Sequence, residues 1–125
     1  MTRDGRAGLS SSGDLDALIN DYVDTAIKNG AAIEESDSKR ANREARRLAR
    51  IKKKLDRKNE LVQGSLLNLL NHVNPWVRSV AAFDCLEFAE AEALETIKQV
   101  ARLPGFVGVG AEWFLRRREK GRTGI

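Results

Sequence analysis

The dipeptide Asn74-Pro75 lies between two apolar runs and determines where the chain must turn. Asparagine at a helix N-cap accepts a backbone N–H from the first turn. Proline suits the first helical position, because its missing N–H would have no partner there. The residue before a proline is also disfavoured in helical geometry. The sequence therefore predicts one helix that ends near His72 and an antiparallel helix that begins at Pro75, joined by a tight turn.

Helical spacing of apolar residues extends over most of the chain, and no stretch alternates with the period of a β-strand. Six helices are predicted, over residues 14–29, 37–58, 61–71, 75–89, 91–102 and 107–120. We expect Asn29-Gly30 to end the first of these, because both residues tolerate the left-handed conformation. Gly108 and Gly110 are expected to allow a neighbouring helix to approach closely. The fold class predicted is all-α.

The length of 125 residues and an apolar fraction of 42% suit one domain with a modest core. We predict a disordered tail over residues 1–13, a single helical domain over residues 14–120, and a second tail over residues 121–125. The expected core contains Val77, Val80, Ala81, Leu86, Leu94, Ile97, Val100 and Phe114. Cys85 is the only cysteine, and no apolar run approaches membrane-spanning length. These features predict a soluble, cytoplasmic protein without membrane contact.

The second predicted helix concentrates the basic residues of the chain, and this concentration needs an explanation. It holds 11 of the 22 basic residues of the chain, over residues 39–58. The candidate binding residues on this basic face are Arg43, Arg46, Arg47, Arg50, Lys53, Lys54 and Arg57. One interpretation is a solvated surface, partly neutralised by the aspartates of the first helix. The other is a contact surface for an anionic partner, either an acidic protein or nucleic-acid phosphates. The helix has no aromatic residue to stack on bases, which argues against single-strand recognition.

Catalytic and metal sites are not indicated by the sequence. One histidine and one cysteine do not make a zinc site without an arranged set of carboxylates. His72 is interpreted as a capping or turn residue, and Cys85 as a small buried side chain. The acidic residues Glu87, Glu90, Glu92 and Glu95 are interpreted as a solvated face. We therefore expect no enzyme activity and no cofactor.

The run from Asn71 to Arg78, followed by Ala81-Ala82, resembles the core of a HEAT-like repeat. In that pattern Val77 packs inward, the alanines let the adjacent helix approach, and Arg78 hydrogen-bonds the turns of neighbouring repeats. The order of features from Leu15 to about Arg117 is also similar to a family of small bacterial helical proteins with HEAT-like structure, filed as a domain of unknown function. The resemblance includes the Leu-Leu-x-Leu-Leu-x-His-x-Asn-Pro-x-Val-Arg run over residues 66–78.

This resemblance implies a short right-handed α-α superhelix of five to six helices. Because several members of the family are associated with immunity to bacterial toxins, it also implies a non-catalytic module that binds a protein, such as an acidic toxin domain. The alternative function is a nucleic-acid-binding protein that uses the basic helix over residues 39–58.

Overall fold

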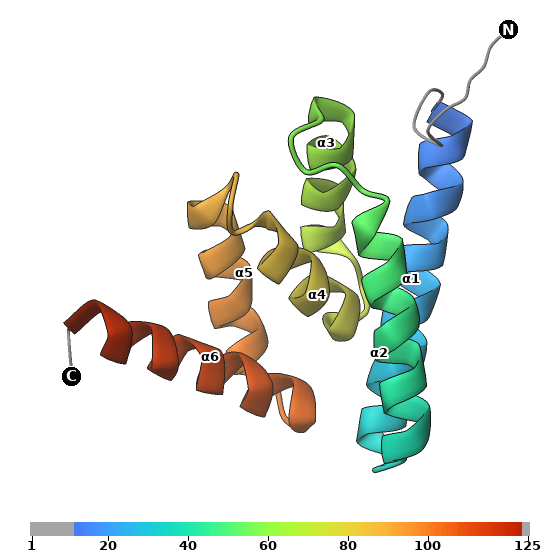
Figure 1. Cartoon of the computed structure of the whole chain (residues 1–125). Coiled ribbons are helices and arrows are strands. Elements are labelled where there is room, and N and C mark those ends of the chain that lie inside the picture. The colour runs from blue at the N-terminus through green and yellow to red at the C-terminus, as the bar shows by residue number, and fades with distance from the viewer. Residues whose placement is uncertain (1–11, 124–125) are drawn as a thin grey trace, which may run out of the picture. The chain divides into compact units, whose positions relative to one another are not determined.

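The computed structural model describes residues 12–123, and this part of the chain contains six α-helices, one short 3-10 helix and no strand (Figure 1). The prediction of an all-α fold is confirmed. The elements are α1 (Ser12–Glu34), α2 (Ser38–Lys53), α3 (Glu60–Asn68), η1 (Leu69–Asn71), α4 (Pro75–Cys85), α5 (Glu90–Ala101) and α6 (Phe106–Thr123). Of the predicted tails, residues 1–11 and 124–125 lie outside the described residues, whereas residues 12–13 and 121–123 are helical.

The chain divides into two compact units, residues 1–65 and residues 66–125. The first contains α1, α2 and the start of α3, and the second contains the end of α3 and everything after it. A single domain over residues 14–120 stays a prediction.

In the first unit, α1 and α2 pack along each other as a helical hairpin. The predicted end of α1 at Asn29-Gly30 is wrong, because α1 continues to Glu34. Two contacts explain the continuation. Ala32 is completely buried, and Asn29 Nδ2 donates a hydrogen bond to the Ala41 carbonyl of α2 at 2.8 Å. Packing against α2 therefore outweighs the local preference of an Asn-Gly pair.

The turn from α1 to α2 is closed by a Schellman motif at residue Ser36. The Ser36 N–H donates to the Ile33 carbonyl at 3.0 Å, and the Asp37 N–H donates to the Ala32 carbonyl at 2.9 Å. Ser36 has a φ of 58°, the left-handed conformation that usually requires glycine. Asp37 then caps α2 by accepting the Arg40 N–H at 3.1 Å. The hairpin turn is thus fixed by local hydrogen bonds on both sides.

The helix α2 ends at Lys53, five residues before the predicted end at Lys58. Two turn-forming side chains account for the early end. Asp56 Oδ1 accepts the Lys58 N–H at 3.0 Å, and Asn59 Oδ1 accepts the Leu61 N–H at 2.8 Å at the start of α3. These bonds form a turn between the two helices, so the predicted basic helix over residues 39–58 is in fact a shorter helix followed by a basic turn.

In the second unit, the turn predicted at Asn74-Pro75 is confirmed. Asn74 Oδ1 accepts the backbone N–H of Trp76 at 2.8 Å and that of Val77 at 3.4 Å, and Pro75 is the first residue of α4. His72 follows η1 and its Nδ1 accepts the Asn74 N–H at 3.0 Å. The interpretation of His72 as a turn residue is therefore also confirmed.

The side chain of Arg78 closes the same turn. Its Nη1 donates to the carbonyls of His72 at 2.7 Å and Val73 at 3.1 Å. The expectation that Arg78 reaches the turns of neighbouring repeats is therefore corrected: in the structure it satisfies the carbonyls just before its own helix.

The core of the second unit lies where α4, α5 and α6 pack together. Four residues of the expected core are completely buried, namely Val77, Ala81, Ile97 and Val100. The other four are only half-buried, namely Val80, Leu86, Leu94 and Phe114. α4 ends at Cys85, short of the predicted Ala89. The ring of Phe114 meets that of Phe83 edge to face, with the centroids 5.0 Å apart.

Only one of the two glycines near the start of α6 allows a close approach. A Cβ atom on Gly108 would lie 1.9 Å from the Leu103 carbonyl oxygen, whereas a Cβ on Gly110 would meet nothing within 4 Å. Gly108 thus lets the backbone of α6 lie directly against the end of the preceding segment. A close approach is therefore confirmed at Gly108, although it is made by the turn after α5 rather than by a neighbouring helix, and the prediction is wrong for Gly110.

Candidate functional site

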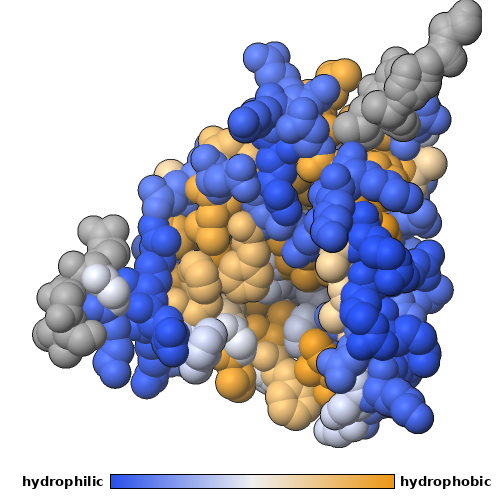
Figure 2. All heavy atoms as spheres, in the orientation of Figure 1, coloured by the Kyte–Doolittle hydropathy of each residue, from blue (hydrophilic) through white to orange (hydrophobic). Residues whose placement is uncertain are grey.

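The helix α2 separates a buried apolar side from a strongly basic exposed side. Leu48 and Ile51 form the buried side, and each is 6% exposed. Basic residues recur at intervals of three and four residues, which places them along one face of a helix. We call this the basic face; it consists of Arg43, Arg46, Arg47, Arg50, Lys53 and Lys54. Figure 2 shows hydrophilic side chains covering α2.

The basic face extends about 16 Å along α2, given a rise of about 1.5 Å per residue. Lys54 is the C-cap of α2, and its backbone N–H bonds the carbonyls of Ile51 and Lys52. The remaining candidate, Arg57, lies in the turn after the helix, where its carbonyl accepts a hydrogen bond from Gln63 Nε2 at 2.6 Å. The structure therefore brings six of the seven candidate residues together and leaves Arg57 off the helical face.

The acidic residues of α1 and α2 that lie nearest to the basic face neutralise little of its charge. Asp21 of α1 lies 3.9 Å from Arg47, and Glu44 lies 4.0 Å from both Arg43 and Arg47. These distances are too long for hydrogen bonds, and exposed ion pairs contribute at most about 1 kcal/mol. Among the described residues, four members of the basic face have no ion pair, namely Arg46, Arg50, Lys53 and Lys54.

Glu44 stands out as the acidic residue within α2. Its side chain is only 12% exposed, and its Oε1 atom is buried without a hydrogen bond from the described residues. A carboxylate in that position offsets part of the mutual repulsion of Arg43 and Arg47, which flank it. The positive charge that remains on the basic face is directed to solvent, where it attracts anionic groups.

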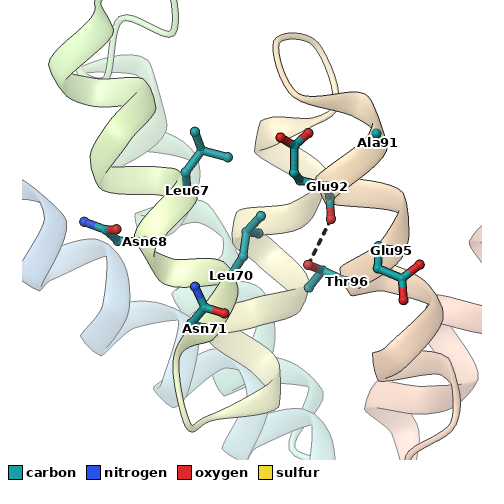
Figure 3. Close-up of a pocket in the computed structure, with 8 residues that line it drawn as sticks. All are labelled: Leu67, Asn68, Leu70, Asn71, Ala91, Glu92, Glu95 and Thr96. Atoms are coloured by element: carbon teal, nitrogen blue, oxygen red, sulfur yellow. Dashed lines mark hydrogen bonds between the residues drawn. The ribbon is translucent and has the colours of Figure 1, made fainter.

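The second unit contains a pocket that the sequence interpretation missed. It has a volume of about 590 Å³ and is lined by Leu67, Asn68, Leu70, Asn71, Ala91, Glu92, Glu95 and Thr96. Figure 3 shows Leu67 and Leu70 extending toward α5, with the Glu92 carboxylate on the facing side and that of Glu95 turned away. A signal was present in the sequence: the four leucines over residues 66–70 are more than one helix face can bury.

The cysteine and the acidic residues of α5 are the other side chains that the sequence offered as candidates for chemistry. Cys85 is completely buried, as expected of a small apolar side chain. Glu92 and Glu95 are exposed, and Glu90 forms an ion pair with Arg118 of α6. Within residues 12–123, no three histidine, cysteine or carboxylate side chains are grouped so that they could hold a metal ion. In the same range, no helix combines the length and apolarity needed to cross a bilayer.

These features define an all-helical protein whose most distinctive surface is a row of cations. A sequence profile of the family described as a domain of unknown function, DUF2019, matches residues 16–115. The chain therefore belongs to that family.

Comparison with solved structures supports the same fold. The crystal structure of the protein RPA1889 from Rhodopseudomonas palustris CGA009 is similar, with a TM-score of 0.76 and 21% sequence identity. The similarity covers 94% of this chain and 96% of that protein. No curated protein matches the sequence.

Proposed function

We propose that the protein is a non-catalytic interaction module that holds an acidic protein on the basic face of α2. The observation that carries this proposal is the row of exposed cations on one side of α2, four of which have no ion pair among the described residues. Arg50 and Lys53 lie in the last turn, where cations suit the helix dipole, but like charges at neighbouring positions are unfavourable, so the stability of the helix does not explain the whole row. An acidic partner would remove the repulsion and supply the missing counter-charges.

We also propose that the helices form a short HEAT-like, right-handed superhelix. The successive packing of α4 on α5 and of α5 on α6 supports it, as does the capped Asn-Pro turn before α4. Repeat folds of this kind present extended surfaces on which partner proteins are bound. The resemblance to proteins associated with toxin immunity supports a toxin domain as the partner.

Binding to duplex nucleic acid is the alternative, since phosphates would also satisfy the cations. The charges beside the basic face favour a protein. Asp21, on the neighbouring α1, is 59% exposed and lies against Arg47. Carboxylates on this helix would repel a phosphate backbone that continues past the basic face. An acidic protein can instead match its charges to both helices.

Photo-crosslinking in cells tests the two functions directly. A photoreactive residue at Arg46 reports the contacts of the basic face, and one at the exposed Lys98 of α5 serves as the position control. We expect a discrete protein adduct from position 46 only. It should be lost when Arg43→Glu, Arg47→Glu and Arg50→Glu are added, and it should remain when the same charge change is made with Lys98→Glu, Arg102→Glu and Arg116→Glu. The absence of any adduct at position 46 would contradict both functions.

A salt titration with generic duplex DNA distinguishes the alternative. If phosphates are the ligand, the wild-type chain binds tightly near about 0.15 M salt, and each contact removed lowers the salt dependence by about one unit. Tight binding that the Arg43→Glu, Arg47→Glu, Arg50→Glu variant abolishes would overturn the protein-binding proposal. Thermal melts of both triple variants should match the wild type, because exposed charges contribute little to folding.

A further inference from the structure

The exposed side of α6 is apolar in its first turns, which is unusual for a surface helix. Phe106, Val109 and Trp113 are 51%, 65% and 61% exposed. Their spacing of three and four residues places them on one side of α6, opposite the buried Val107 and Ala111. We call these three residues the α6 stripe. A row of large apolar side chains in water indicates a binding surface.

Basic residues continue the α6 stripe toward the end of the helix. Arg117 lies four residues after Trp113, and its guanidinium stacks over the Trp113 ring at 5.1 Å from the centroid. Arg116 is 78% exposed and pairs with Glu112 at 2.8 Å. The exposed side of α6 thus presents an aromatic anchor with a cation directly beside it.

The pocket between the end of α3 with η1 on one side and α5 on the other combines an apolar wall with a negative charge. Leu67 and Leu70 supply an apolar wall, and Glu92 supplies a carboxylate that faces it (Figure 3). Glu95 also lines the pocket, but its exposed carboxylate is turned away and accepts a hydrogen bond from Gln99 Nε2 at 3.4 Å. The pocket is an open depression of about 590 Å³ on the surface, which leaves it accessible to side chains of a partner helix.

We infer that the α6 stripe of one copy of this chain docks into the pocket of a second copy. Trp113 would pack against the two leucines, and Arg117 would approach Glu92. This is the recognition of an amphipathic helix by a groove, with a cation and a carboxylate that fix its orientation. The inference rests on matched apolarity and opposite charge in two surfaces of the same sequence, and it makes no use of the basic face of α2.

The two surfaces differ, so the contact joins copies head to tail. A head-to-tail dimer retains one unoccupied pocket at one end and one unoccupied stripe at the other, so the assembly grows with concentration rather than stopping at a dimer. A two-fold contact of α6 with itself would instead stop at the dimer.

Complementary variants test this geometry by sedimentation velocity. The stripe variant carries Trp113→Ala and Arg117→Ala, and the pocket variant carries Glu92→Lys and Glu95→Lys; all four positions are exposed. We expect the mass of the wild-type chain to rise with concentration beyond that of a dimer, within the range up to about 1 mM typical of weak contacts. Each variant alone should remain monomeric. An equal mixture should form a dimer that grows no further, because only one pocket and one stripe remain to pair.

A matched control carries Glu60→Lys and Glu119→Lys, which change the net charge as the pocket variant does but lie outside the pocket. It should assemble like the wild type, and melting curves should show that all variants are folded. A wild-type chain that stays monomeric over the whole range would overturn the inference. So would variants that still assemble alone, or a mixture that stays monomeric.

Discussion

The helices α2 and α5 are both amphipathic, but they use their side chains in opposite ways. α5 buries Ile97 and Val100 completely, and its exposed side includes both acidic and basic residues. α2 buries Leu48 and Ile51 almost completely, and every charged residue at its exposed positions is basic. The packing of α5 therefore explains most of its sequence. The apolar residues of α2 stabilise the hairpin with α1. Packing does not explain the charges of α2, so we attribute them to a binding partner.

The largest expected effect is the loss of a side chain from the core beside α5. Ile97→Ala should lower the free energy of unfolding by about 2–5 kcal/mol, because Ile97 is completely buried. Leu94→Ala should cost less, about 1–2 kcal/mol, because Leu94 is only half-buried. Chemical denaturation measures both values. Equal losses for the two variants would mean that the core extends around Leu94 as well.

A methyl group at Gly108 should produce the next largest effect. Gly108→Ala would place a Cβ atom 1.9 Å from the Leu103 carbonyl oxygen, so α6 must shift, at an expected cost of about 1–3 kcal/mol. Gly110→Ala is the matched control. It meets nothing within 4 Å, and the higher helix propensity of alanine should stabilise the protein by about 0.5–1 kcal/mol. Thermal melts that shift in the same direction for both variants would contradict this packing.

The N-cap of α4 should contribute less to the free energy of unfolding than the core residues do. Asn74→Ala removes the acceptor of the Trp76 and Val77 N–H groups and should cost about 1 kcal/mol. The control is Asn71→Ala, since Asn71 is exposed and caps no helix. Urea denaturation compares the two. A loss at Asn74 no greater than that at Asn71 would show that the cap bonds are replaced by water without cost.

The smallest expected effect is a gain in stability from a substitution in the turn between α1 and α2. Ser36→Gly should stabilise the protein by about 0.5–1 kcal/mol, because glycine adopts the positive φ of 58° without steric strain. Ser38→Gly, at the first residue of α2, should be neutral or destabilising, because the position is helical. A calorimetric melt that shows no gain at Ser36 would mean that flexibility of the unfolded glycine chain offsets the relief of strain.

The dipeptides Asn74-Pro75 and Asn29-Gly30 show which helix boundaries could be predicted from the sequence and which could not. The turn at Asn74-Pro75 was predictable because proline restricts the chain whatever its surroundings. Asn29-Gly30 did not end α1, because the burial of Ala32 against α2 overrides a weak local preference. The early end of α2 was missed because Asp56 and Asn59 were not recognised as turn and cap residues.

The same distinction applies to the surfaces. The basic face could be predicted because exposed charges at helical spacing need no knowledge of packing partners. The excess of leucines over residues 66–70 indicated some exposed apolar surface, but the positions of the pocket and of the α6 stripe could not be predicted. Leu66 and Leu69 are buried whereas Leu67 and Leu70 line the pocket, and the sequence does not show which pair is covered. The sequence likewise does not show that Phe106 and Trp113 are exposed whereas Phe114 is half-buried.

The turn before α4 also has a consequence for the order of folding. All of its hydrogen bonds, including those from Arg78 to His72 and Val73, join residues at most six positions apart. Such a loop closes in far less than a millisecond and needs no distant part of the chain. The turn is thus available as an early nucleus for α4. We expect Asn74→Ala to slow refolding in stopped-flow experiments while leaving the unfolding rate nearly unchanged.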